Sequence, residues 1–178
     1  MILHPEQTVL AVIDVQERLM PHIQGGDHIV ARCLRLIEGF RALNLPVVIT
    51  EQYPKGLGRT VAAILERASG FPVIEKRDFS SCGAPEFLRA LAGRDQVLLC
   101  GVEAHVCVSQ TALDLLAEGR QVHVAGDAAG SRTLEDREVG LQKMRAAGAV
   151  PASSESALFE LLRTSTHAQF KAISALVR

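Results

Sequence analysis

Short apolar runs alternate with helix-like segments along this chain, and that alternation limits its possible folds more than any other feature. Most of the runs are solidly apolar and lack the two-residue alternation of a strand with one exposed face. Strands that are apolar on both sides are typical of a parallel sheet covered by helices on both faces. The six runs occupy residues 8–13, 46–50, 71–75, 97–100, 121–125 and 149–152.

Helical patterns fill the intervals between these runs. Apolar residues recur there at helical spacing, and Gly119 and Gly148 end two of the patterns. We therefore predict a single domain over residues 1–178, with a three-layer α/β/α architecture and a doubly wound, six-stranded, mainly parallel sheet of Rossmann-like type. The predicted helices cover residues 27–43, 60–68, 85–92, 105–117, 135–147, 153–162 and 166–177.

Composition and charge argue against several classes of partner. The 178 residues carry a formal net charge of −1, with no basic run and no tryptophan, so no nucleic acid is expected as a partner. No apolar stretch approaches the roughly 20 residues of a membrane span, so no membrane association is expected. The four cysteines form no CxxC pair and the six histidines no HExxH motif. We therefore expect neither a metal nor another cofactor, and reduced thiols in the cytoplasm.

Polar side chains at the ends of the predicted strands are the candidates for a functional site. In a doubly wound sheet the ligand crevice lies outside the carboxyl ends of the strands. Asp14, Lys76, Asp127 and the turn before Cys107 stand at such ends. A carboxylate can take the proton of a thiol, and an ammonium group can stabilise both anions. Asp14, Lys76 and Cys107 together therefore indicate nucleophilic catalysis on a small-molecule substrate.

Cys107 follows the tight strand-to-helix turn GVEAHVC and lies in the first turn of the predicted helix. The free amides and the partial positive charge there would lower the pKa of the thiol and could hold an oxyanion. A lone cysteine beside an apolar helix is more often a small core residue. The acid and the lysine at other strand ends favour the catalytic interpretation.

Five segments carry a resemblance to a known family. They are DVQ at Asp14, EQYPKGLGRT, EKRDFSS around Lys76, GVEAHVCVSQTALD around Cys107, and the late GDAAGSR segment. In this order and spacing they resemble the isochorismatase-like cysteine hydrolases, most closely the isochorismatase-domain-containing branch. The resemblance extends from about residue 8 to residue 162.

The resemblance implies a six-stranded α/β fold and a Cys–Asp–Lys triad that attacks amide-type bonds. On this pattern Cys107 is the nucleophile, Asp14 the base and Lys76 the orienting cation. The family pattern also implies a cis peptide bond between Val102 and Glu103, which would aim the backbone amides of Glu103 and Cys107 at the oxyanion. A homo-oligomer, such as a dimer or a tetramer, is implied as well.

Two departures from the family narrow the expected reaction. Nicotinamidase members hold a metal with an Asp-x-His motif after the second strand, where this chain reads TEQYPKG. Isochorismatases proper cleave a vinyl ether and commonly lack the nucleophilic cysteine, whereas this chain has Cys107. We therefore expect cleavage of a small amide or a related C–N bond through a thioester, without a metal.

Residues next to the triad motifs are candidates for the walls of the substrate pocket. Their side chains include amides, an acid, two aromatic rings and an imidazole that could contact substrate. The six candidates are Gln16, Glu51, Gln52, Tyr53, Phe79 and His105.

Two alternatives compete with the amidase interpretation. A catalytically silent binding or scaffold module could keep the same fold, although such a module has no need of all three triad residues. A phosphatase of the haloacid-dehalogenase type would place its nucleophile at Asp14. That class needs further acids where Gln16 and Ser131 stand, so it fits poorly.

Overall fold

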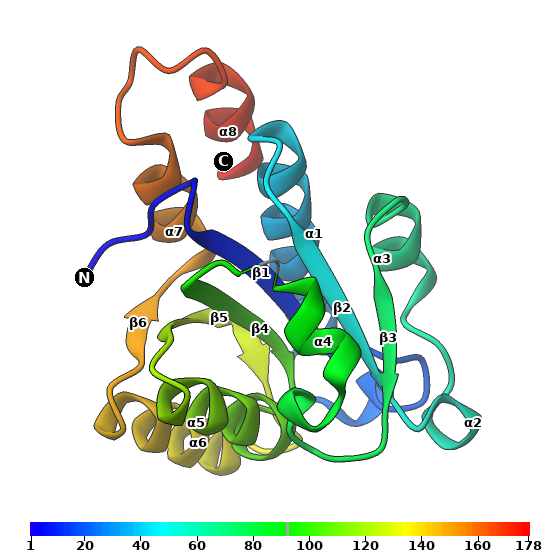
Figure 1. Cartoon of the computed structure of the whole chain (residues 1–178). Coiled ribbons are helices and arrows are strands. Elements are labelled where there is room, and N and C mark those ends of the chain that lie inside the picture. Colours follow the sequence, from blue (N-terminus) through cyan, green and yellow to red (C-terminus); the bar gives the residue numbers. More distant parts are fainter. Residues whose placement is uncertain (92) are drawn as a thin grey trace.

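The computed structural model describes residues 1–91 and 93–178, and its strands form a six-stranded sheet with helices on both faces (Figure 1). Every neighbouring pair is parallel, and the strand order is β3-β2-β1-β4-β5-β6. The predicted doubly wound α/β/α fold is confirmed, with a sheet that is parallel throughout. The strands are β1 (Thr8–Ile13), β2 (Val47–Gln52), β3 (Val73–Lys76), β4 (Gln96–Val102), β5 (Gln121–Gly130) and β6 (Val150–Ala152).

The two faces of the sheet carry separate apolar cores. In β1, Leu10 and Val12 belong to one core while Val9 and Ala11 belong to the other, because successive side chains of a strand point to opposite faces. One core is covered by α1 (Gly26–Ala42), α3 (Ala62–Arg67), α7 (Ser154–Leu162) and α8 (Phe170–Leu176). The other is covered by α4 (Pro85–Ala90), α5 (Ser109–Ala117) and α6 (Leu134–Ala146).

Four short elements lie in the connections between strands and helices. The short helix α2 (Pro54–Leu57) follows β2, within the segment that the sequence predicts as a loop. The others are the single turns η1 (Met20–His22), η2 (Ser81–Gly83) and η3 (Ala104–Val108), of which η3 is π-helical. Alanine 92, the last residue of the helix predicted over 85–92, falls outside the described residues.

Four strands continue beyond their predicted carboxyl ends, β3 by one residue and β4 by two, while β2 and β5 have further consequences. β2 continues to Gln52, two residues beyond the predicted end, and pairs there with Lys76 of β3. β5 continues to Gly130, through the GDAAG stretch that the sequence predicts as a loop. A register shift between Leu99 and Gly101 lets β5 remain paired with β4 up to Val102. All four extensions lie at the carboxyl edge of the sheet.

The chain order reverses between β1 and β4, which are neighbours at the centre of the sheet. Gly101 permits their close approach, since a Cβ atom on it would collide with the backbone of Ile13 and its φ of +112° is unfavourable for other residues. The residues that follow β1 and β4 therefore leave the sheet side by side. In folds of this kind, that reversal point is where ligands bind.

None of the helices in residues 1–91 and 93–178 combines the length and the apolarity that crossing a membrane requires.

His123 lies inside the sheet without a hydrogen bond to either ring nitrogen. It is fully buried on β5, in register with Leu98 of β4 and Val150 of β6. Burial lowers the pKa of His123 below the ordinary value of 6.5. The folded protein therefore holds this imidazole neutral, whereas the unfolded chain takes up a proton as the pH falls below that value.

We predict that His123 makes the protein less stable in acid. As the pH falls from 6.5 to 5.5 the free energy of unfolding should fall more steeply in the wild type than in His123→Leu, because the wild-type unfolded chain takes up this proton and the folded protein resists it. Urea unfolding at both pH values measures the difference, with the exposed His28→Leu as the control. Equal acid sensitivity in wild type and His123→Leu would contradict the assignment.

Candidate active site

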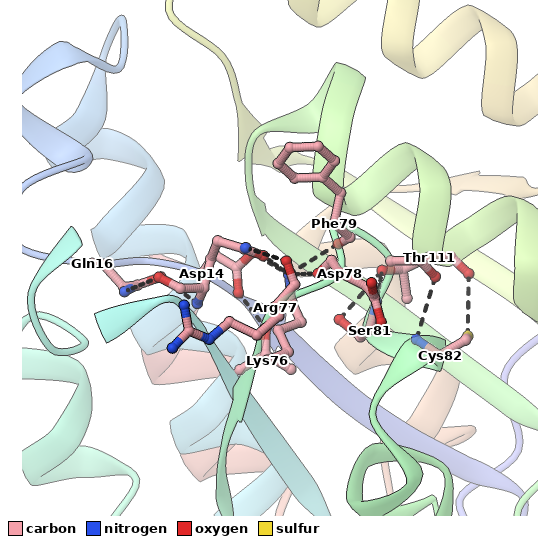
Figure 2. A network of polar contacts seen from close by, with 12 residues as sticks. Asp14, Gln16, Lys76, Arg77, Asp78, Phe79, Ser81, Cys82 and Thr111 are labelled. Atoms are coloured by element: carbon pink, nitrogen blue, oxygen red, sulfur yellow. Dashed lines mark hydrogen bonds and ion pairs between the residues drawn. The ribbon is translucent and has the colours of Figure 1, made fainter. Parts of the chain in front are cut away.

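An ion pair between Asp14 and Lys76 lies at the carboxyl edge of the sheet (Figure 2). Asp14 is the first residue after β1 and Lys76 is the last residue of β3, with β2 between them. Asp14 Oδ2 is 2.7 Å from Lys76 Nζ, and the side chains are 0% and 1% exposed. The hydroxyl of Thr50, on β2, donates to Asp14 Oδ1 at 2.7 Å.

The ammonium group of Lys76 has three further oxygen acceptors. Nζ donates to Oε1 of Gln52 at 2.8 Å, to the carbonyl of Phe79 at 2.9 Å and to the carbonyl of Asp78 at 3.2 Å. Figure 2 shows the chain bending around Lys76 after β3, while the ring of Phe79 points away from the polar network. Polar partners of this kind offset the cost of removing two charges from water.

Cys107 lies in the turn η3, between β4 and α5, and is 7% exposed. Burial, followed by the charge of Asp14 and a hydrogen bond with its side chain, raises the pKa of the Cys107 thiol to about 12. The positive charge of Lys76 and a backbone hydrogen bond from Glu103 act in the opposite direction. The expectation of a lowered thiol pKa is therefore wrong, because burial and a nearby carboxylate outweigh the helix end. The raised pKa favours the neutral, protonated thiol.

The turn η3 is built closely against its surroundings. The peptide bond between Val102 and Glu103 is cis, in agreement with the family resemblance. A Cβ atom on Gly140 of α6 would lie 2.7 Å from the carbonyl of Ala104, so α6 packs directly on the backbone of the turn. Glycine at this position lets the helix cover the turn that carries Cys107.

A pocket of about 640 Å³ opens above Asp14 and Cys107. Five of the predicted site residues line it: Asp14, Gln52, Phe79, Glu103 and Cys107. Lys76 is paired with Asp14 but is not part of this lining. Sequence reasoning missed the remaining lining residues, which are Arg18, Leu19, His22, Gly56, Leu57, Val106 and Arg132.

The positions of the missed residues explain why they were missed. Arg18, Leu19 and His22 follow Asp14 in the segment that turns back over the strand end, and Arg132 directly follows GDAAGS. Proximity to a recognised motif is the signal that could have indicated them. Leu57 reaches the pocket only because α2 folds back toward the residues after β1, where the N–H of Arg18 donates to its carbonyl at 3.0 Å.

Gln16 and Glu51 support the pocket loop through backbone contacts. Gln16 is fully buried; its Nε2 donates to the carbonyls of Gln52 and Gly58 at 3.0 and 2.7 Å, and its Oε1 accepts from the N–H of Gln52 at 2.7 Å. Glu51 is also fully buried, and its Oε1 accepts from the N–H and the hydroxyl of Thr60 at 2.7 and 2.8 Å. Neither belongs to the pocket lining, so their contacts fit a positioning role better than the predicted contact with substrate.

Tyr53 and His105 also lie outside this lining. The ring of Tyr53 stacks with the guanidinium of Arg77 at 4.3 Å, and Tyr53 lines a separate cavity of about 390 Å³. His105 Nδ1 is 3.0 Å from the hydroxyl oxygen of Ser131, a contact that ties η3 to the end of β5.

Asp127, another acid predicted at a strand end, serves the helix α7. Its carboxylate accepts from the N–H of Ser154 at 2.7 Å and from the Ser154 hydroxyl at 2.6 Å. An acid at a helix N-terminus is favourable because it meets free N–H groups there.

Within the described part of the chain, no group of three or more histidine, cysteine, aspartate and glutamate side chains is arranged to hold a metal ion.

Comparisons with known proteins agree on one family. The model of the isochorismatase domain matches residues 8–156. Isochorismatase domain-containing protein 2A of Mus musculus is 42% identical over 177 residues, which cover 98% of this chain and 84% of the mouse protein. Isochorismatase domain-containing protein 1 of Salmo salar is 41% identical over 98% of this chain, which spans 62% of the length of that relative.

Solved structures have the same fold. The MAR1 ribonuclease from Caenorhabditis elegans superposes with a TM-score of 0.96 at 39% identity, covering 99% of this chain and 92% of the worm chain. YcaC from Pseudomonas aeruginosa, solved with hexane-2,5-diol and covalent acrylamide, has a TM-score of 0.92 at 27% identity, covering 98% and 91%. The sequence and the structure together therefore show that this chain belongs to the isochorismatase family.

Proposed function

We propose that this protein is a cysteine hydrolase that cleaves a small amide, or a related C–N bond, through a thioester acyl-enzyme. The observation that carries the proposal is the buried Asp14–Lys76 ion pair beside the Cys107 thiol, at the floor of a pocket of about 640 Å³. The family contains hydrolases, and the pocket is large enough for a small ligand.

In the acylation step Asp14 acts as general base. The Cys107 thiol is neutral, so its proton moves to the Asp14 carboxylate as the sulfur attacks the carbonyl carbon of the amide. Lys76, 2.7 Å from the carboxylate, keeps a positive charge next to the developing thiolate. We assign the oxyanion of the tetrahedral intermediate to the backbone amides of Glu103 and Cys107.

Collapse of the intermediate breaks the C–N bond. The amine leaves with the proton held by Asp14, and the acyl group remains on the sulfur as a thioester. Asp14 then takes a proton from a water molecule, whose oxygen attacks the thioester carbonyl. The acid product leaves, and the sulfur recovers its proton from Asp14.

The structure of YcaC from P. aeruginosa supports a small amide as ligand. That protein, of the same fold, holds covalent acrylamide, an unsaturated amide of small size. The name of the C. elegans protein, in contrast, is that of a ribonuclease. The net charge of −1 and the absence of a basic run lead us to expect no RNA cleavage by this chain, and an RNA oligonucleotide belongs in the assay panel as the comparison.

Two further proposals concern the protein as a whole. Its four cysteines are unpaired, in keeping with a reducing, cytoplasmic location. Leu134 and Val139 of α6 are 56% and 62% exposed, and we propose that this helix contributes to a homo-oligomer contact.

We predict that Cys107→Ala abolishes turnover without unfolding the protein. Hydrolysis of a panel of small amides, followed by release of ammonia or amine, should fall at least about a thousandfold because no acyl-enzyme can form. The matched control is Cys82→Ala, since Cys82 lies outside the pocket and its sulfur faces the Thr111 carbonyl at 4.0 Å. Turnover by Cys107→Ala at the wild-type rate would rule out the mechanism.

We predict that Asp14→Asn lowers the pKa of the Cys107 thiol and nevertheless slows turnover. Asparagine removes the negative charge that raises the Cys107 pKa and leaves the charge of Lys76, so the thiol pKa should drop toward the ordinary value of about 8.5. Turnover should nevertheless fall at least about a hundredfold, because the base is lost. The pH dependence of iodoacetamide labelling gives the thiol pKa. The exposed Asp114→Asn on α5 is the control, and an unchanged labelling profile in Asp14→Asn would count against the assignment of Asp14.

We predict that the protein sediments as a dimer or a larger assembly of its 19.2 kDa chain. The double variant Leu134→Asp, Val139→Asp should shift it to the monomer, because two charges would have to be buried in the contact. Ala63→Asp, an exposed position on α3, is the control. A monomeric wild type in analytical ultracentrifugation would refute the proposal.

A further inference from the structure

An ion pair between Glu103 and Arg132 forms part of the pocket wall. Oε2 of Glu103 accepts from Nε of Arg132 at 3.0 Å and from the backbone N–H of Arg132 at 3.2 Å. The Glu103 side chain is 11% exposed, whereas that of Arg132 is 59% exposed. The glutamate is therefore held in the wall, and Nε of Arg132, in the same pocket lining as Cys107, already has an anionic partner.

The other charged groups of the lining differ in their partners. Asp14 is paired with Lys76 at 2.7 Å. Arg18 and His22 are exposed, and Nη1 of Arg18 donates to the carbonyl of Gly56 at 3.0 Å.

Apolar side chains supply much of the remaining wall. They are Leu19, Leu57, Phe79 and Val106. Phe79, which is 54% exposed, adds accessible apolar surface to this wall.

We propose that this pocket selects an uncharged amide, and that Glu103 makes the selection by occupying Arg132. A carboxylate on the substrate would approach Arg132 only in competition with the Glu103 carboxylate, and like charges in contact are unfavourable. A neutral substrate meets no such penalty. The inference rests on the proposed function, because it concerns the substrate of the same site.

A purely structural role for the pair predicts a different result. The contact between His105 and Ser131 joins the same two segments, so Glu103 and Arg132 could simply add a second tie. In that case a change at either residue would affect stability without affecting the charge of the preferred ligand. The decisive measurement is therefore whether Cys107 reacts faster with a neutral reagent or with an anionic one.

Iodoacetamide and iodoacetate give a matched pair of probes, since they differ in one neutral or anionic end group. With each reagent a sulfur–carbon bond forms at Cys107, iodide leaves and the thiol proton is released. Peptide mass spectrometry measures the rate at which each reagent labels Cys107. The iodoacetate-to-iodoacetamide rate ratio at Cys107 is then divided by the same ratio for glutathione, which corrects for the intrinsic reactivity of the two reagents. This ratio requires no hydrolysis and no knowledge of the natural substrate.

In the wild type we expect Cys107 to favour iodoacetamide over iodoacetate more strongly than glutathione does. Glu103→Gln should raise the relative rate of iodoacetate by about tenfold, because Arg132 becomes available to the anion, and added salt should reduce this gain. Arg132→Gln should lower the rate of iodoacetate relative to iodoacetamide by a similar factor. The double variant should return close to the wild-type ratio, and Glu138→Gln, an exposed charge change outside this pocket, should match the wild type.

A wild-type preference for iodoacetate would overturn the inference, as would ratios that stay within about twofold in both single variants. If Glu103→Gln does not fold, Arg132→Gln still decides the question. The raised pKa of the Cys107 thiol makes alkylation slow at neutral pH, so both reagents are compared at alkaline pH. Failure of wild-type Cys107 to react with either reagent even there would be a different outcome. It would count against Cys107 as the nucleophile, and the inference would fall with the proposed function.

Discussion

The buried ion pair between Asp14 and Lys76 is the interaction on which the rest of the site depends. With side chains 0% and 1% exposed, neither charge is solvated by bulk water, and removing one partner from such a pair typically costs about 3–5 kcal/mol. The Thr50 hydroxyl, the Gln52 side chain and two backbone carbonyls complete the shell around the pair. The pair lies beside a thiol at the point where the strand order reverses, and on the proposed mechanism it serves proton transfer.

Much of the fold and the centre of the site could be predicted because both follow from local patterns. Solid apolar runs mark the strands, and parallel strands bring their carboxyl ends to one edge, so Asp14, Lys76 and Cys107 converge. The continuation of β5 through GDAAG had no such pattern, because its pairing with β4 depends on a register shift. The roles of Gln16 and Glu51 were equally hidden, since they depend on how the loop after β2 folds back to bring Gly58 and Thr60 to these side chains.

The ionisation of Cys107 shows where sequence reasoning reached the wrong result. A helix N-terminus alone would lower the pKa of the thiol, and that local effect was visible in the sequence. Burial and the Asp14 carboxylate, which depend on tertiary structure, act more strongly in the opposite direction. On the proposed mechanism, the neutral thiol therefore lies next to its base, and proton transfer accompanies attack. Glu103 has two parts in this account, one through its backbone amide and one through its side chain on Arg132.

The ultraviolet absorbance of the thiolate, titrated in the wild type and in Cys107→Ala, tests the central claim most directly. The difference between the two proteins isolates Cys107 from the other three cysteines. A base-dependent neutral thiol predicts that no Cys107 thiolate appears until well above the ordinary thiol pKa of about 8.5. Titration of Cys107 below that value would show a preformed thiolate and contradict the role given to Asp14.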